Sequence, residues 1–247
     1  VVPIIKRPLA LYDLCEKMTI LVDDDEIIVG NKGPYFFSSP EYPEWGICGW
    51  VVDEVEAGNW YLDEKDGLYH NPEDEGIRLT ISPEDYEYLR SVREYWAHRK
   101  VGTMADAWQP EGFDELQRLN VSSYVKGGMS LIALPAGHLI AGYKKIINTG
   151  YGAIRKQAQD WIDEHRGNLM GEDIDKYMFY KAAVITCDAA TLLIKRYAGK
   201  CREKSEEAAD ENRKKELLVM ADGLEWISEN PARNFREAVQ GIMCYQV

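Results

Sequence analysis

One histidine stands apart among the residues that could do chemistry. His138 lies in a segment, residues 134–143, where glycines on both sides let the backbone turn tightly and bring an imidazole to a cavity wall. The residues alone favour a structural, hydrogen-bonded histidine and leave a substrate contact open. His70, His98 and His165 lie in polar stretches without a second ligand at a metal spacing, so the sequence predicts surface positions for them and no metal site.

The cysteines form no pattern of a disulfide framework or a zinc site. They number five, are widely spaced and include no C-x-x-C pair, which fits a reducing cytoplasm. Cys187 lies on the apolar stripe of a predicted helix, where a free cysteine packs like a small hydrophobic residue. Cys48 lies beside glycines that could expose its sulfur, but no neighbouring histidine or lysine would activate it, so we expect it to pack as well.

Three short acidic or glycine-containing runs could be mistaken for ligand sites. Residues 23–26 read D-D-D-E, but they lack the alternating spacing and the glycine of a calcium loop, so we expect a solvated turn. Gly30-x-x-Gly33 and Gly150-x-Gly152 are too short for a phosphate loop and carry no dinucleotide fingerprint. We expect turns and helix caps at both places.

The composition is typical of a folded, water-soluble protein. Of the 247 residues, 45% are hydrophobic and 29% are charged. The formal net charge of −13 would repel a phosphate backbone, and the basic residues are scattered among acids, so nucleic acid and a membrane surface are disfavoured as partners. No apolar run approaches the roughly 20 residues that cross a bilayer and no signal peptide precedes the first proline, so we expect a cytoplasmic protein.

In the first hundred residues, the pattern predicts a few short elements. We expect a short helix at 8–18 with its proline in the first turn, then two short strands or extended segments at 19–30 around the acidic turn. The aromatic, Pro- and Gly-rich residues 34–59 predict irregular structure, and residues 61–76 predict an exposed acidic excursion. A helix is expected at 83–99, because S-P-E-D supplies a cap, a first-turn proline and an acidic first turn.

The remainder of the chain is predicted to be mostly helical. Residues 127–137 form an apolar loop without a helical period, and a helix is expected at 151–165. From residue 173 onward, apolar residues recur at helical spacing in one stripe, and a second helix repeats the pattern at 217–227. A third helix is expected at 234–245. The residues alone thus indicate a largely helical domain with one unusual histidine loop.

Five blocks of residues occur in one order along this sequence. Residues 24–31 read D-D-E-I-I-V-G-N and are followed by E-Y-P-E at 41–44, and residues 95–104 contain Y-W and then G-T-M. Gly137-His138 precedes a Tyr-Lys pair and a glycine further on, at 143, 144 and 150. Residues 185–198 read I-T-C-D-A-A-T and then K-R-Y-A, and residues 230–240 contain N-P and F-x-E-A-x-Q.

In this order and spacing, the blocks resemble the amino-terminal part of the pyruvate formate-lyase-like domain of glycyl radical enzymes. The resemblance runs the full length and is closest to the branch of glycerol dehydratase, hydroxyproline dehydratase and choline lyase. It implies a mainly α chain with a few short strands, forming the amino-terminal, largely helical portion of a ten-stranded α/β barrel. Within residues 1–247, a partial domain, it implies a strand- and loop-rich part at 1–60, a helical part with the acidic excursion at 61–130, the histidine loop at 131–150 and a helical part at 151–247.

The resemblance also implies an activity. Such enzymes are dehydratases, lyases or formate acetyltransferases (acyltransferases) that cleave C–C, C–O or C–N bonds of a small organic substrate by thiyl radical hydrogen abstraction. They are expected to be homodimers. The backbone glycyl radical is installed by an activating enzyme that uses S-adenosylmethionine and an iron–sulfur cluster. His138 matches a histidine that contacts a substrate hydroxyl group in the dehydratase branch. Gly142 stands where dehydratases often have Asp, which argues against a polyol or choline substrate and leaves room for an aryl or hydroxy acid.

Two family segments are missing from these residues. No R-V-x-G-Y radical loop occurs, and no C-x-E stands where the cysteine finger should be, so we expect no catalytic residue in this chain and no turnover by the chain alone. The first interpretation is an amino-terminal fragment or split subunit of a glycyl radical enzyme. The alternative is a non-catalytic helical interaction module that retains the family scaffold, and the most distant one is an unrelated helical scaffold.

Overall fold

The computed structural model describes residues 2–31, 33, 49–71, 79–99, 103, 107, 112 and 141–246. The chain divides into two compact units, one formed by residues 1–40 with 140–247 and the other by residues 41–139. The predicted irregular segment before residue 49, the loop at 127–137 and Cys48 lie outside the described residues.

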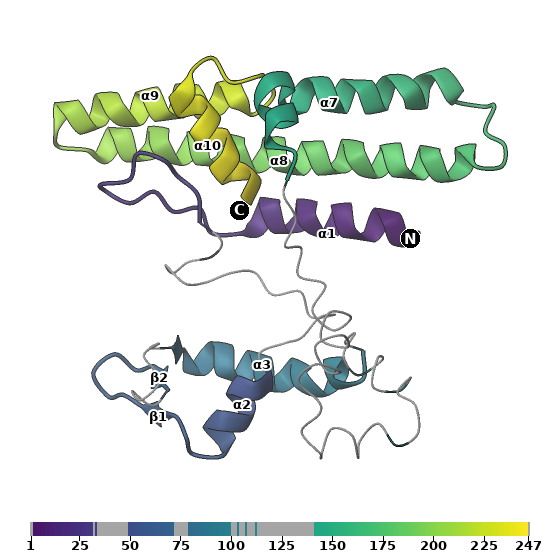
Figure 1. Cartoon of the computed structure of the whole chain (residues 1–247). Coiled ribbons are helices and arrows are strands. Elements are labelled where there is room, and N and C mark those ends of the chain that lie inside the picture. The colour runs from purple at the N-terminus through teal and green to yellow at the C-terminus, as the bar shows by residue number, and fades with distance from the viewer. Residues whose placement is uncertain are drawn as a thin grey trace. The chain divides into compact units, whose positions relative to one another are not determined.

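The first unit is a body of long helices, which we call the helical body (Figure 1). The central helix is α8, which contacts α1, α7 and α9, while α10 packs on α7, α8 and α9. The bounds of these helices are α1 Pro3–Lys17, α7 Tyr143–His165, α8 Asp173–Glu207, α9 Glu211–Ile227 and α10 Phe235–Gln246.

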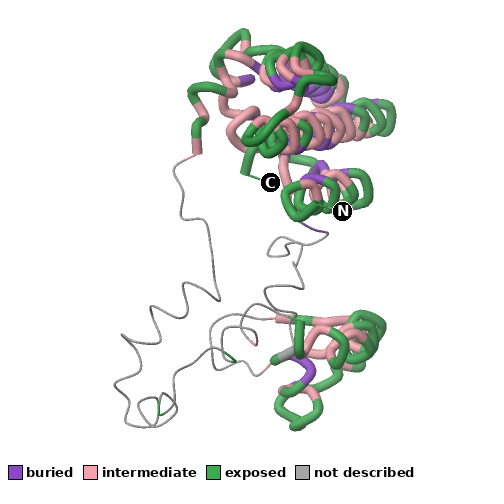
Figure 2. Tube along the Cα trace, turned by 90° about the vertical axis from the view of Figure 1, so that its right-hand side faces the viewer, coloured by how far each residue is buried: buried purple, intermediate pink, exposed green. Residues whose placement is uncertain are grey.

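The apolar stripes predicted from the sequence form the core of the helical body. Three residues of the predicted stripe on α8, Cys187, Ile194 and Tyr197, are buried, while Tyr180 and Val184 are half-buried. On α9 the buried residues include all four that marked its period, Leu217, Met220, Leu224 and Ile227. Figure 2 shows buried positions along these helices. The predictions of helices at 151–165, 173 onward, 217–227 and 234–245 are confirmed.

The first helix starts earlier than predicted. It begins at Pro3, which occupies the first-turn position where a missing N–H costs nothing, and Pro8 lies buried inside the helix instead of in its first turn. Residues 19–30 contain no strand, so only the extended-segment alternative holds. Side chains of α9 and α10 bond the backbone there in place of a strand ladder: Arg213 donates to the Asp23 and Glu26 carbonyls, and Gln240 donates to the Val29 carbonyl.

Helix α8 is long and apolar enough to cross a membrane by length and composition alone, and within the described parts of the chain no other helix meets both criteria. The mean hydropathy of its most apolar 18-residue window is 1.3. Contacts with α1, α7 and α9 explain this composition, because a helix that packs on three neighbours needs apolar residues on most of its circumference.

The second unit combines two short helices with a small antiparallel sheet. The sheet has the order β1-β2-β3, with Tyr61 opposite His70 and His70 opposite Thr80. Trp60 and two valines of α2, Val51 and Val52, are buried. The element bounds are α2 Gly49–Glu56, β1 Tyr61–Leu62, β2 Tyr69–His70, β3 Thr80–Ile81 and α3 Pro83–Ala97.

One prediction for this unit was wrong: residues 49–56 form a helix rather than irregular structure. The predicted exposed excursion is exposed at residues 61, 62 and 64–67, and residues 61–70 form a hairpin that was not predicted. Both elements are too short to show a hydrophobic period. The helix predicted at 83–99 is present as α3, and the Ser82 side chain accepts a hydrogen bond from the Asp85 N–H at 3.0 Å, as expected of its cap.

Candidate functional site

The predicted substrate contact, His138, lies outside the described residues. The structure begins again at residue 141 and shows the remainder of the same sequence block, which includes Tyr143 and Gly150. The contacts that can be described are those of the residues that follow the histidine segment. They lie in the first turns of α7 and in the parts of the helical body that contact these turns.

The first turn of α7 is tied to the end of α10. The Tyr143 hydroxyl accepts a hydrogen bond from the Gln246 amide at 2.6 Å. The ring of Tyr143 meets the ring of Tyr245 edge to face, with 5.5 Å between centroids. These contacts fix the point at which the chain enters α7.

Gly150 breaks α7 and lets two backbones cross. Its φ of 76° lies in the left-handed region that favours glycine. A Cβ at Gly150 would lie 2.5 Å from the Glu229 carbonyl oxygen and 2.5 Å from the Asn230 carbonyl carbon. The Gly152 N–H donates to the Glu229 carbonyl oxygen at 2.8 Å, so the end of α9 meets the start of the second part of α7. Gly150 separates two helical segments, which agrees with the expected turn or cap, but its close approach to residues 229–230 was not predicted.

A second junction ties residues 29–31 to α8 and α10. The Gln240 amide donates to the Val29 carbonyl at 2.7 Å and accepts from the Val29 N–H at 2.9 Å. The Tyr197 hydroxyl accepts from the Asn31 N–H at 2.7 Å and lies 2.7 Å from the Asn31 side-chain oxygen. Burial raises the pKa of Tyr197 to about 12, so the phenol stays neutral and can both donate and accept.

The four cysteines among the described residues are buried in the core of the helical body. Cys187 packs there as predicted. Burial raises the pKa of Cys201 to about 11 and that of Cys244 to about 12, and it also raises the pKa values of Cys15 and Cys187. These thiols remain protonated at neutral pH, which makes them poor nucleophiles.

The histidines that the sequence placed on the surface are not alike. His98 is exposed, but His165 is half-buried and stacks on Trp161 with 4.1 Å between centroids. His70 is half-buried, and its Nε2 lies 2.8 Å from the Asp66 carboxylate. Ligating atoms of Asp63, Asp66 and His70 lie within 4.8 Å of one another, a grouping that sequence reasoning missed. The same carboxylates already accept N–H groups within the hairpin turn, which accounts for their positions.

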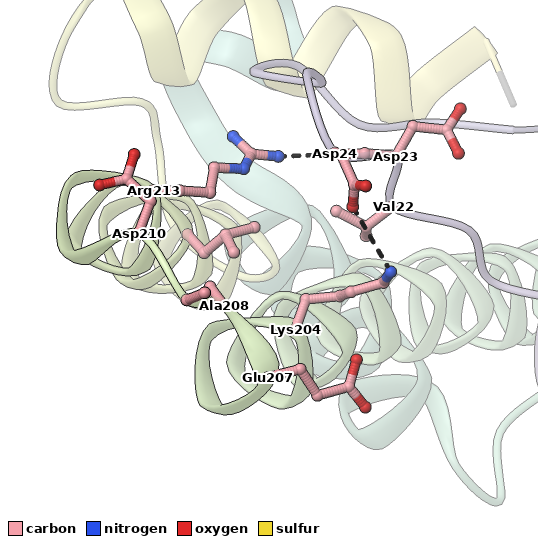
Figure 3. Close-up of a pocket in the computed structure, with 10 residues that line it drawn as sticks. Val22, Asp23, Asp24, Lys204, Glu207, Ala208, Asp210 and Arg213 are labelled. Atoms are coloured by element: carbon pink, nitrogen blue, oxygen red, sulfur yellow. Dashed lines mark hydrogen bonds and ion pairs between the residues drawn. The ribbon is translucent and has the colours of Figure 1, made fainter.

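The acidic turn borders a charged pocket at the corner between α8 and α9 (Figure 3). The pocket holds about 340 Å³. Lys204 lies 3.8 Å from Asp24, and Arg213 donates to the Asp23 carbonyl at 2.9 Å. Asp23 and Asp24 are exposed, so the expected solvated turn is confirmed, while burial raises the pKa of the half-buried Glu26. Both cations are used to hold the turn, and nothing in the pocket points to a ligand.

Comparison with known proteins decides the family. A family model described as pyruvate formate lyase-like matches residues 1–247. The chain belongs to the pyruvate formate lyase-like family. The family assignment made from the sequence blocks is therefore confirmed.

Relatives within this family are glycyl radical enzymes. The chain is 26% identical to isethionate sulfite-lyase of Nitratidesulfovibrio vulgaris over 246 residues, which is 96% of the chain and 28% of the relative. It is 27% identical to the probable dehydratase YbiW of Escherichia coli, covering 98% of the chain and 27% of the relative. The solved structure of glycerol-bound, B12-independent glycerol dehydratase from Clostridium butyricum matches with a TM-score of 0.79 and 27% identity, covering 98% of this chain and 28% of that one.

The pyruvate formate lyase-like chain thus spans just over a quarter of the length of these relatives. It corresponds to the amino-terminal part of glycyl radical dehydratases and lyases, and its mainly helical architecture agrees with the expected amino-terminal, largely helical portion of the barrel fold.

Residues from the sequence blocks contact one another at the two junctions. Three separate blocks meet at residues 29–31, where Gln240 bonds the Val29 backbone and Tyr197 bonds the Asn31 N–H. Gly150 and Asn230 come from two blocks and meet at the backbone crossing. Neither junction was predicted. The only signal within the sequence was a polar residue on an otherwise apolar face, as at Tyr197 and Gln240.

Proposed function

We propose that this chain is the amino-terminal part of a glycyl radical dehydratase or lyase, either joined to the remaining domain in one polypeptide or paired with it as a split subunit. The observation that carries the proposal is the family match over residues 1–247 together with coverage of only 28% of the glycerol dehydratase chain. The remaining three-quarters would supply the catalytic cysteine and the radical glycine. This chain would supply outer helices and one wall of the substrate pocket.

Within that wall, His138 is the residue proposed to contact a substrate hydroxyl group. Tyr143, five residues later, is fixed to α10 through Gln246. A neutral imidazole can donate or accept one hydrogen bond to a hydroxyl, which is the role proposed here.

The substrate is proposed to be less polar than a polyol. Gly142, which carries no carboxylate, stands where dehydratases often have Asp, and apolar residues flank His138 in the sequence. A site without that carboxylate has one fewer acceptor for substrate hydroxyl groups, so an aryl or hydroxy acid fits it better than glycerol or choline.

The partners follow from the same proposal. An activating enzyme with S-adenosylmethionine and an iron–sulfur cluster would generate the glycyl radical on the remaining domain, and the complete enzyme would be a homodimer in the cytoplasm. A glycyl radical supplies one-electron chemistry that ordinary side chains lack, and the protein's share is to bind, orient and shield the substrate.

The site proposal is tested by His138→Ala in the complete, activated enzyme, with His98→Ala as the matched control on an exposed histidine. Steady-state kinetics would be measured with glycerol, trans-4-hydroxy-L-proline, isethionate and indoleacetate as probes. Loss of one hydrogen bond to substrate should lower kcat/KM about tenfold for the preferred probe, with the glycyl radical content unchanged. Unchanged kinetics in the His138 variant would exclude the contact.

The enzyme interpretation is tested by reading the coding sequence that follows this chain, together with neighbouring reading frames. A segment with C-x-E and a terminal radical glycine loop supports the proposal. If neither the same frame nor a neighbouring one encodes such a segment, the non-catalytic helical module is the better account.

A further inference from the structure

The helical body has an exposed apolar face at the meeting of residues 23–31, α9 and α10. Three large apolar side chains stand in water there: Ile27 is 56% exposed, Val219 57% and Phe235 85%. Ile27 and Val219 line a small pit, and Phe235 lies between two residues that also line it, Asn234 and Arg236. We call Ile27, Val219 and Phe235 the α9–α10 patch.

The pit has the form of an anchor site for one apolar side chain. Its volume is about 50 Å³, and Met220 and Leu224 on its wall are buried. A water molecule needs about 10–15 Å³ on this measure, so the pit has room for the tip of one aliphatic side chain. Gly223 on α9 also lines the pit, and because it has no side chain it leaves that part of the pit open.

The patch is held in place before anything binds it. Arg236 donates to the Ile27 carbonyl at 3.3 Å, and Gln240 bonds both backbone groups of Val29. The Asn234 side chain accepts from the Glu237 N–H at 3.0 Å and caps α10. A surface already fixed in this way loses little conformational entropy when a partner covers it.

This face differs from the charged pocket at the α8–α9 corner. There the exposed groups are carboxylates, lysine and arginine that pair with one another or with the backbone. At the α9–α10 patch, Ile27, Val219 and Phe235 are exposed, while Asn234 and Arg236 give the pit a polar edge. Covering the apolar side chains removes apolar area from water at a gain of about 25 cal/mol per Å². The patch therefore suits a protein partner with apolar side chains.

We propose that an apolar segment of the remaining domain of the pyruvate formate lyase-like barrel covers the α9–α10 patch and inserts one side chain into the pit. The structural match covers 98% of this chain but only 28% of the glycerol dehydratase chain. The larger part of that fold therefore has to pack on faces such as this one. The inference rests on the proposed function for the existence of that domain.

The test compares Val219→Asp with Leu218→Asp. Leu218 is the matched control, because it lies on the same helix, is 47% exposed and does not line the pit. In the complete enzyme, Val219→Asp should lower the thermal midpoint clearly more than Leu218→Asp, because it buries an unpaired carboxylate. In the 247-residue chain alone, the two variants should differ little.

A labelling experiment gives the second readout. In the complete enzyme, Val219→Cys and Phe235→Cys should react with a maleimide at least about tenfold more slowly than Leu218→Cys. Equal rates would overturn the proposal, as would protection that depends on protein concentration, which would indicate a second copy of the chain. A Val219→Asp effect of the same size in the 247-residue chain would also overturn it.

The two proposals fail in different ways. If the complete enzyme carries a glycyl radical but all three cysteine variants label at one rate, the interface is wrong and the enzyme assignment stands. If Val219 and Phe235 are protected but no glycyl radical forms with the activating enzyme, the interface stands and the radical function fails.

Discussion

The two described units of the chain bury their apolar surface in different ways. In the helical body, α8 packs on α1, α7 and α9, and the buried residues of α8 and α9 recur at helical spacing along each helix. In the second unit, among described residues, the buried side chains are Val51, Val52 and Trp60, held by two short helices and three two-residue strands. A core of long helices leaves a period in the sequence, whereas a core of three side chains leaves none.

The largest effect is expected at the backbone crossing of the helical body. Gly150→Ala combines a left-handed φ of 76° with a Cβ that would lie 2.5 Å from two backbone atoms. Strain and overlap together should cost about 4 kcal/mol in the free energy of unfolding. The measurement is urea denaturation followed by circular dichroism.

The control for this variant is Gly199→Ala. Gly199 lies inside α8 and has open space around the position of an added Cβ. Alanine there should stabilise the helix by up to about 1 kcal/mol. Equal destabilisation by both substitutions would show that the crossing is not a special constraint.

Alkaline pH should weaken the helical body. The pKa of Cys201 is about 11 and that of Cys244 about 12 in the folded chain, both above the ordinary value of 9.0. A pKa raised by folding gives stability that is complete below the ordinary value and is lost as pH rises toward the folded value. Between pH 8 and 10, the two thiols together should cost about 3 kcal/mol, measured as the denaturation midpoint at each pH.

Cys201→Ala provides the check on this pH dependence. It should remove about half of the loss between pH 8 and 10, because one of the two ionising thiols is gone. A variant with the full pH dependence of the parent would assign the alkaline loss to other groups, such as Tyr197, whose pKa is also raised to about 12.

The third prediction concerns the small core of the second unit. Val52 is fully buried, so Val52→Ala should cost about 2 kcal/mol through lost burial and a cavity. Hydrogen exchange should show the loss in α2 and α3, with α8 and α9 unchanged. Loss of protection in α8 as well would contradict the claim that the two units have separate cores, because the two units would then unfold as one.

The smallest effect is expected at the cap of α3. Ser82→Ala removes the acceptor for the Asp85 N–H and should cost about 1 kcal/mol, seen as faster exchange in the first turn of α3. Ser91→Ala on the same helix is the control, since the Ser91 hydroxyl bonds only to the Tyr88 carbonyl and caps no free N–H. Similar effects from the two variants would argue against the capping role.

The part of the fold that could be predicted consists of helices with a sustained apolar period or a recognisable capping sequence. Helices α8, α9 and α10 each repeat an apolar residue every three or four positions, and α3 starts at a Ser-Pro signal. Helix α2 has only eight residues, and each strand has two, so neither can show a period. The early start of α1 was missed because Pro8 was taken as a helix-starting proline, although Pro3 serves that role.

The candidate site was predictable to a smaller extent. Resemblance to a family pointed to His138, but physical reasoning from the residues alone favoured a structural role for it. The junction of Val29 with Gln240 joins residues 211 positions apart, and one sequence carries no signal for such a pairing. The same holds for Gly150 and Asn230, where the need for glycine arises only from a close backbone approach.

The most direct measurement of the central claim is electron paramagnetic resonance after anaerobic treatment with the activating enzyme. We expect no glycyl radical doublet from the 247-residue chain alone, and a doublet once the remaining domain is present, in the same polypeptide or as a second chain. A doublet from the 247 residues by themselves would contradict the account, as would a complete assembly that never forms one.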